Sequence, residues 1–281
     1  RPDRIAAMSC NPAIGGLAKG QIVREVDAMG GLMGRAIDAS GIMFKMLNTS
    51  RGPAVRGPRA QADRYAYSAE IQRLLATRAN LHVISGTVEE FLINQERIEG
   101  VRLPTGSGPV SPRLDDGTSW MEHLPEPIWP GVPEEKDRSA TVLDLRAPSV
   151  VLTTGTFMRG LMHTGDQKTP GGRVNEPAAV GMSGTLQELG FELGRLKTGT
   201  PPRLRRGSID WDGLPLQEAD ESPVPFSDFP IAELPTQRFP VLPQVSCRIT
   251  HTNDTVHELI RENLHRAPMF NGDIDASHGP R

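Results

Sequence analysis

The sequence predicts a mixed α/β fold, and three patterns support this prediction. Apolar residues recur at helical spacing in four segments, at about 17–29, 67–75, 182–189 and 256–264. Short β-like runs alternate with them, at 81–84, 87–93, 98–103, 141–145 and 149–152. The last run is apolar and ends in Thr-Thr-Gly-Thr, as buried strands do where a dinucleotide-binding sheet presents bare backbone to its ligand.

The first helix is predicted from Ile22, Val23, Val26 and Met29, and the pair Gly30-Gly31 provides its stop. Residues 35–59 are rich in Gly, Ser and Arg, and we expect them to be a long irregular stretch.

The second helix is predicted from an apolar stripe that begins at Tyr67, and Asn80 terminates it. Residues 94–97 read as a turn between the strands at 87–93 and 98–103. In the last helix, Thr252-Asn253 supplies the expected N-cap.

Two Pro-rich segments interrupt these elements. Residues 104–140 contain seven prolines and are predicted to be an insertion between two strands. Residues 207–243 are Pro-rich and acidic, and we expect a surface excursion or a domain crossover there.

Composition excludes several classes of protein. Of the 281 residues, 37% are hydrophobic and 23% charged, as in ordinary globular proteins. There is no apolar run of about 18 residues and no signal-like start, so we expect a cytoplasmic protein, or a mitochondrial matrix protein if it is eukaryotic. Two distant cysteines, Cys10 and Cys247, do not make a disulfide scaffold. Because the patterns at Arg1 and Arg281 break off, we expect a fragment of a longer protein.

Residues 8–16, Met-Ser-Cys-Asn-Pro-Ala-Ile-Gly-Gly, form the most informative segment. A cysteine at the mouth of the first helix would meet unpaired N–H groups and the positive end of the helix dipole, so we expect Cys10 to be held partly as thiolate. Gly15 and Gly16 allow the backbone to lie against a flat or phosphorylated ligand. The alternative is a buried, inert cysteine beside an ordinary turn.

Charge is distributed unevenly along a chain whose net charge is −3. Basic residues gather in two segments, one with Arg51, Arg56, Arg59 and Arg64 and the other with Arg195, Lys197, Arg203, Arg205 and Arg206. Such clusters suit a phosphate-bearing partner. Pairing with internal carboxylates, or simple solvation, is the alternative.

Other chemistries find little support in the sequence. No His-x-x-x-His pair or Cys-x-x-Cys motif occurs, so no metal site is expected. There is no Gly-x-Ser-x-Gly elbow of a serine hydrolase and no Walker loop.

Eight motifs in one order resemble the MnmG (GidA) family of tRNA uridine 5-carboxymethylaminomethyl modification enzymes. They are Met8-Ser-Cys-Asn-Pro-Ala-Ile-Gly-Gly, Glu25-Val-Asp-Ala-Met-Gly-Gly-Leu-Met, Gly52-Pro-Ala-Val-Arg, Arg59-Ala-Gln-Ala-Asp-Arg, Leu152-Thr-Thr-Gly-Thr-Phe, Gly171-Gly-Arg, Gly194-Arg-Leu-Lys-Thr-Gly-Thr-Pro-Pro-Arg and Ile249-Thr-His-Thr-Asn. The resemblance covers almost the whole chain, apart from 104–140 and about 210–240.

The resemblance implies an FAD-dependent enzyme that acts on the wobble uridine of tRNA. In that family the GTPase MnmE is the partner in a heterotetramer, NADH reduces the flavin, and 5,10-methylenetetrahydrofolate supplies one carbon, with glycine or ammonium as the amine source. A homodimer is also implied. We expect Cys10 to be the catalytic nucleophile or acid/base group. Cys247 does not match the second reactive cysteine of the family, which would fall just beyond Arg281.

The resemblance also implies the binding residues. The cofactor-binding set is Asn11, Gly15, Gly16, Val88, Thr154, Gly155 and Thr156, with Gly279, Pro280 and Arg281 at the start of the nicotinamide-binding stretch. The set facing tRNA phosphates is Arg51, Arg56, Arg59, Lys197 and Arg203, where the charge pattern agrees.

The family fold implies an incomplete Rossmann-like FAD-binding domain over residues 1–206, without its first strand and glycine-rich turn. Residues 207–281 would begin a second, inserted α/β domain associated with NAD. Without that turn, we expect the isolated fragment to bind FAD poorly and to be inactive. Two other functions stay open: a flavin-dependent thiol oxidoreductase, and a non-catalytic tRNA-binding or assembly module.

Overall fold

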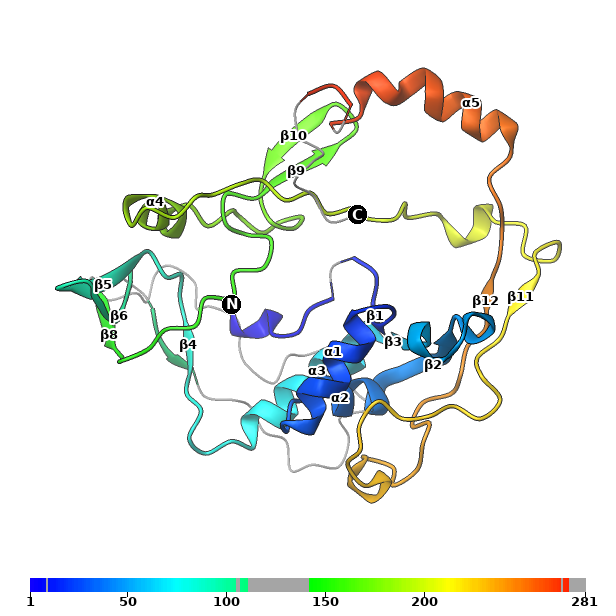
Figure 1. Ribbon diagram of the computed structural model, residues 1–281, viewed down its shortest axis with the longest axis horizontal. Coiled ribbons are helices and arrows are strands. Elements are labelled where there is room, and N and C mark those ends of the chain that lie inside the picture. The colour runs from blue at the N-terminus through cyan, green and yellow to red at the C-terminus, as the bar shows by residue number, and fades with distance from the viewer. Residues whose placement is uncertain (9, 105–106, 111–141, 269, 273–281) are drawn as a thin grey trace. The chain divides into compact units, whose positions relative to one another are not determined.

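The computed structural model describes residues 1–8, 10–104, 107–110, 142–268 and 270–272. Both helices and strands occur along them (Figure 1), and the α/β fold class is confirmed. Within these ranges the chain forms two compact units. The first unit contains residues 1–83 and 201–250, and the second contains 84–109, 142–200 and 251–272. The domain division expected above, at 206/207, follows another criterion and stays a prediction.

The first unit combines three helices with a three-stranded antiparallel sheet of order β1-β3-β2. Its helices are α1 (Lys19–Ala28), α2 (Met33–Ser40) and α3 (Arg64–Ala76), and the sheet strands are β1 (Ala13–Gly15), β2 (Gly41–Leu47) and β3 (Gly57–Ala62). Strands β11 (Leu216–Gln217) and β12 (Cys247–Arg248) pair with each other in a separate two-stranded sheet. Helices α1 and α3 confirm the two helices expected in this part of the chain.

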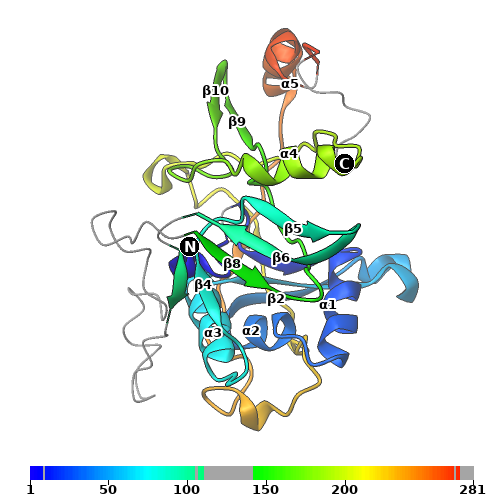
Figure 2. The same cartoon turned by 90° about the vertical axis from the view of Figure 1, so that its left-hand side faces the viewer.

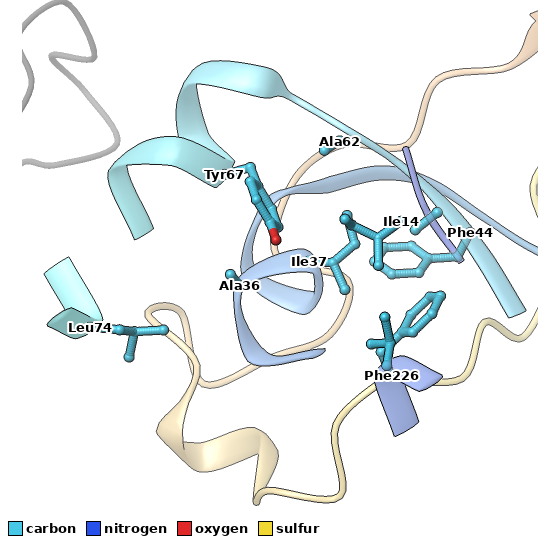
Figure 3. Packing of buried hydrophobic residues seen from close by; sticks show 10 residues of the cluster. Ile14, Ala36, Ile37, Phe44, Ala62, Tyr67, Leu74 and Phe226 are labelled. Atoms are coloured by element: carbon cyan, nitrogen blue, oxygen red, sulfur yellow. The ribbon is translucent and has the colours of Figure 1, made fainter. Parts of the chain in front are cut away.

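One face of the sheet builds the core of the first unit. Ile14, Ala60 and Phe44 lie opposite one another on the three strands and are at most 2% exposed. Ile37 from α2 packs with them, and Figure 3 shows Phe226 in the same cluster. Because side chains alternate along a strand, the residues between these core positions must point to the opposite face.

That opposite face carries polar and charged side chains in register. Gly15 of β1 and Lys45 of β2 both lie opposite Arg59 of β3. Ala13 and Met43 both lie opposite Gln61. Residues directly opposite in an antiparallel sheet share a face, so Arg59 and Gln61 stand beside the glycine turn. We call this the Arg59 face of the sheet.

The expectation of a long irregular stretch at 35–59 was wrong. Most of it is α2 and β2, followed by two short 3-10 turns at Thr49–Arg51 and Pro53–Val55. Asp38 and Ser40 of α2 are buried and hydrogen-bonded: the Ser40 hydroxyl donates to the Ala36 carbonyl at 2.6 Å, and Asp38 accepts two backbone N–H groups. These buried polar residues hid the helical pattern, since periodicity counts apolar residues alone.

The expectation of a surface excursion at 207–243 was wrong at its centre. Phe226 is 1% exposed, and two carboxylates hold the backbone of residues 226–228. Asp38 accepts the Phe226 and Ser227 N–H groups at 2.8 Å each, and Asp27 accepts the Asp228 N–H at 3.0 Å. Arg24 donates to the Phe226 carbonyl at 2.6 Å and to Asp228 at 2.9 Å. These bonds from α1 and α2 satisfy backbone N–H and carbonyl groups of residues 226–228, so this part of the loop can be buried.

The second unit contains an antiparallel sheet of order β5-β6-β8, whose three strands lie side by side in Figure 2. Its strands are β4 (Val83–Ser85), β5 (Glu90–Asn94), β6 (Arg97–Leu103), β7 (Gly108–Val110), β8 (Leu143–Arg146), β9 (Leu161–Thr164) and β10 (Gln167–Pro170), and its helices are α4 (Gly181–Glu188) and α5 (Asp254–Asn263). Arg102 of β6 pairs with Asp144 of β8 at 2.8 Å and with Glu90 of β5 at 3.2 Å. The turn expected at 94–97 is confirmed between β5 and β6.

The helix cap expected at Asn253 is confirmed: its side chain accepts the Val256 N–H at 3.0 Å. The buried strand expected at 149–152 was wrong, because Val151 is 86% exposed and no strand of the described ranges pairs with this segment. A strand needs a hydrogen-bonded neighbour, and an apolar run alone does not supply one. The insertion expected at 104–140 falls mostly outside the described residues.

Candidate functional site

Residues 10–16 form a loop that includes β1, and hydrogen bonds fix it along its length. The Pro12 carbonyl accepts the Ala62 N–H at 2.7 Å, and the Gly16 N–H donates to the Pro58 carbonyl at 2.8 Å. Ala13 donates its N–H to the Asn11 carbonyl at 2.7 Å. The Arg203 guanidinium donates to the Cys10 carbonyl at 2.7 Å. The loop therefore rests on β3 and on a residue of the second basic segment.

The two glycines of this loop have left-handed backbones, with φ of 100° at Gly15 and 94° at Gly16. A Cβ on Gly15 would overlap the Pro58 carbonyl oxygen, so only glycine fits there. A Cβ on Gly16 would meet no atom within 4 Å beyond its chain neighbours. The Gly16 backbone thus has room on that side for a ligand group.

Cys10 is half-buried and takes part in no disulfide within the described residues. It does not lie at the mouth of a helix, because β1 stands between it and α1, which begins at Lys19. The expectation that Cys10 lies directly before a helix was therefore wrong. Asn11, the next residue, is exposed.

The first basic segment forms two different environments. Arg51 and Arg56 are exposed on a loop after β2, where Arg56 donates to the Thr49 carbonyl at 3.2 Å. Arg59 is half-buried on the Arg59 face, directly opposite Gly15. Arg203 belongs to the first unit as well, through its bond to Cys10. The structure thus brings Cys10, Arg203, Arg59 and the glycine pair into one unit.

The other expected binding residues lie in the second unit. Val88 and Thr154 are half-buried, and Gly155 has a left-handed φ of 59°. The Thr156 hydroxyl donates to the Gly172 carbonyl at 3.3 Å, so the motifs around 154–156 and 171–173 meet. Arg173 lies over the Phe157 ring at 4.9 Å and pairs with Glu176 at 2.9 Å.

Lys197 is half-buried and belongs to the second unit too. Gly279, Pro280 and Arg281 lie outside the described residues. Across the ranges that the structure describes, no group of three or more His, Cys, Asp or Glu side chains is arranged to hold a metal ion. Nor does any described helix have the length and apolar character needed to cross a bilayer.

Sequence reasoning missed three residues that shape this site. Phe226 supports Gly15 from the core side, since a Cβ on Gly15 would lie 2.8 Å from Phe226 Cζ. Asp38 holds Phe226 in place, and burial raises the pKa of its carboxyl to about 7. Lys19 donates to the Ala13 carbonyl at 3.1 Å beside the glycine pair. Only Lys19 had a sequence signal: it follows the glycine pair by three residues.

Comparison with known proteins decides the family. The family model of glucose inhibited division protein A matches residues 1–110 and 137–281. The chain belongs to the GidA family. A curated relative from Rhodopirellula baltica, the tRNA uridine 5-carboxymethylaminomethyl modification enzyme MnmG, is 46% identical over 279 residues. The MnmG of Granulibacter bethesdensis is 43% identical over 280 residues.

Solved GidA structures agree with the family assignment. Aquifex aeolicus GidA in its form II crystal matches 95% of this chain with a TM-score of 0.73 and 38% identity. The form I crystal matches 96% with a TM-score of 0.74 and 37% identity. The chain covers 99% of its own length in the alignment with the R. baltica relative, but only 38% of that relative. The present chain therefore spans about 38% of the length of this relative.

Proposed function

We propose that the complete protein is an FAD-dependent enzyme that modifies the wobble uridine of tRNA to 5-carboxymethylaminomethyluridine or its aminomethyl form. The observation that carries this proposal is the fixed Cys10 loop: a thiol, a left-handed glycine pair and two guanidinium groups lie in one unit of a GidA chain. The relatives are named for this modification.

The proposal includes the partners and cofactors of the family. The GTPase MnmE is the protein partner, the enzyme is a homodimer, NADH is the reductant, and 5,10-methylenetetrahydrofolate is the one-carbon donor. FAD, when bound, supplies a two-electron redox centre to the reaction. The protein is proposed to act in the cytoplasm.

One observation supports a fit between the residues of the Cys10 loop and a planar cofactor. The space beside Gly16 is free of other atoms within 4 Å of a built Cβ, so the backbone can approach a ring closely. Asn11, Gly15 and Gly16 would hold the flavin in the first unit. Val88, Thr154, Gly155 and Thr156 are proposed as cofactor-binding residues as well. Residues 279–281 would begin the nicotinamide site. The domain division at 206/207 is part of this proposal.

Cys10 is proposed to activate the substrate uracil. Carbon C5 of uracil is a weak nucleophile, because the ring carbonyls withdraw electron density from it. Addition of the Cys10 thiolate to C6 moves the ring π-electrons toward C5 and the C4 carbonyl, so C5 can attack the one-carbon unit. C5 attack breaks one of the two C–N bonds of the methylene unit, and loss of the C5 proton then expels tetrahydrofolate from it. The amine of glycine or ammonium bonds to the methylene carbon, and departure of the thiolate restores the ring. Arg51, Arg56, Arg59, Lys197 and Arg203 would bind tRNA phosphates.

The test is Cys10→Ser in the full-length protein, with Cys247→Ser as the matched control. Cys247 lies on β12, where its sulfur contacts the Met43 sulfur at 3.3 Å on the same face of the sheet as Gln61. We expect Cys10→Ser to retain bound FAD, seen as flavin absorbance, and to lose wobble modification, measured by nucleoside mass spectrometry. Cys247→Ser should keep both. Normal modification by Cys10→Ser would refute the catalytic role.

A second measurement separates the proposal from a non-catalytic tRNA-binding module. Purified wild-type full-length protein should show flavin absorbance and should form modified uridine with MnmE and the two co-substrates. A colourless protein that binds tRNA without modifying it would favour the binding module instead.

A further inference from the structure

The structure places two cations, Lys19 and Arg59, at the glycine turn. Lys19 donates to the Ala13 carbonyl at 3.1 Å, and Arg59 lies opposite Gly15, two residues further along β1. Neither side chain makes an ion pair among the described residues. Both therefore belong to one small part of the surface.

The charge of this pair is not balanced by its neighbours. The next cation across the sheet, Lys45, has its own partners, because it donates to the Glu218 carbonyl at 2.8 Å and lies 3.8 Å from an Asp220 oxygen. Partial burial and the nearby Arg59 charge both lower the pKa of Lys19. Two adjacent like charges cost folding free energy. A ligand with negative charge would offset this cost by binding both cations.

A polar group without a partner lies on the same face. The Gln61 amide oxygen is buried and accepts no hydrogen bond from any described residue. Gln61 is two residues from Arg59 on β3, so the two side chains project from the Arg59 face in the same direction. A buried amide oxygen of this kind is satisfied when a ligand N–H or O–H donates to it.

We propose that Lys19 and Arg59 bind a phosphate group of a nucleotide at the glycine turn, with Gln61 accepting a hydrogen bond from the same ligand. An ammonium and a guanidinium together give donors of the geometry that phosphate prefers. The phosphate would belong to a dinucleotide cofactor or to substrate RNA, and these two candidates depend on the proposed function. The site itself is inferred only from the arrangement of these residues.

The first experiment measures the response to inorganic phosphate. Full-length wild type, Lys19→Gln, Arg59→Gln and the control Arg78→Gln are melted in sodium phosphate and in sodium chloride of equal ionic strength. Arg78 is an exposed cation just after α3. Phosphate should raise the Tm of the wild type and the control, because a ligand that binds only the folded state stabilises it. The two site variants should lose this response, with phosphate affinity at least 10-fold weaker.

The same melts contain a second signature. In sodium chloride, Lys19→Gln and Arg59→Gln should melt at or above the wild-type temperature, because each removes one of two repelling charges. Lys19→Arg, which keeps the charge, should keep the phosphate response. If both site variants respond to phosphate as the control does, or if they melt well below wild type in chloride, the proposal is wrong.

Two further arms identify the source of the phosphate. FAD binding to flavin-stripped protein and binding of an anticodon stem-loop RNA are each measured for wild type and the same variants. A 10-fold loss confined to FAD assigns the site to the cofactor, and one confined to RNA assigns it to the substrate. If the two site variants lose the phosphate response and the wild type does not modify the wobble uridine, this site is supported and the proposed function is refuted.

Discussion

The Phe226 ring lies so close to Gly15 that a Cβ on Gly15 would be 2.8 Å from Phe226 Cζ. Pro58 closes the other side of the same glycine through its carbonyl oxygen. Gly15 is thus held between a strand and a distant aromatic ring, and the glycine turn takes its shape from both.

Gly15→Ala should destabilise the protein by about 2 kcal/mol or more, through overlap with Pro58 and a strained left-handed φ. Urea unfolding followed by circular dichroism measures this. Gly16→Ala is the matched control: its φ is also left-handed, at 94°, but its added methyl group meets open space. It should cost only about 1 kcal/mol. Equal losses in the two variants would contradict the packing described for Gly15.

Phe226→Ala should cost about 3–5 kcal/mol, because it leaves a cavity in the core beneath β1. Val224, two residues earlier and 68% exposed, provides the control. Val224→Ala should change the free energy of unfolding by less than about 0.5 kcal/mol. If the two variants unfold at the same urea concentration, residues 224–226 are not anchored in the core.

The Asp38 carboxyl predicts a pH dependence of stability. Burial raises its pKa to about 7, with a further contribution from Asp27, while the Phe226 and Ser227 N–H groups and Arg24 act in the opposite direction. The unfolded carboxyl titrates near about 3.9. Between these values the folded state binds more protons than the unfolded state, so this group makes stability fall as pH rises from about 4 to 7.

Asp38→Asn isolates this effect, because the amide does not titrate. The difference in unfolding free energy between wild type and Asp38→Asn should shift against the wild type by on the order of 2 kcal/mol between pH 5 and pH 8. Urea unfolding at the two pH values measures it. A difference that stays constant with pH would show that Asp38 keeps an ordinary pKa.

The Asp63 side chain begins α3 by accepting the N–H groups of Tyr65 and Ala66 at 2.9 and 3.0 Å. Asp63→Ala should therefore cost about 1 kcal/mol, whereas Asp63→Ser should restore most of it, since serine also caps helices. Thermal melts of the two variants measure the effect. Equal melting temperatures would rule out a capping role.

Arg203→Gln should make the Cys10 thiol more reactive by several-fold, because it removes the bond to the Cys10 carbonyl and loosens the loop. Iodoacetamide labelling of the Cys10 peptide, followed by mass spectrometry, reports the rate. Arg205→Gln, a neighbouring exposed arginine, should leave the rate unchanged. Equal rates in the two variants would show that Arg203 does not restrain the loop.

The sequence was sufficient for elements whose signals are local. Helices α1, α3 and α5 carry apolar stripes, and Asn253 caps α5 through its own side chain. Helix α2 was missed because Asp38, a buried polar residue, satisfies its carboxylate with N–H groups of residues 226 and 227. No local pattern announces a partner so far along the chain.

The candidate site divides in the same way. Cys10, Gly15 and Gly16 stand out in the sequence, since a cysteine before a glycine pair is a local motif. The nearness of Arg59 to Gly15 depends on the register of β1 against β3, which the sequence does not display. Lys19 becomes significant only once that register places a second cation beside it.

The position of Phe226 in the core of the first unit also has a consequence for biosynthesis. Phe226 follows Asp38 by 188 residues, yet its backbone satisfies that carboxylate and its ring supports Gly15. A ribosome that has synthesised the chain only as far as residue 100 has delivered the Cys10 loop without the aromatic ring that packs against Gly15. The nascent loop must wait for translation to reach this phenylalanine, and the first unit completes its folding only after residues of the second unit have left the exit tunnel.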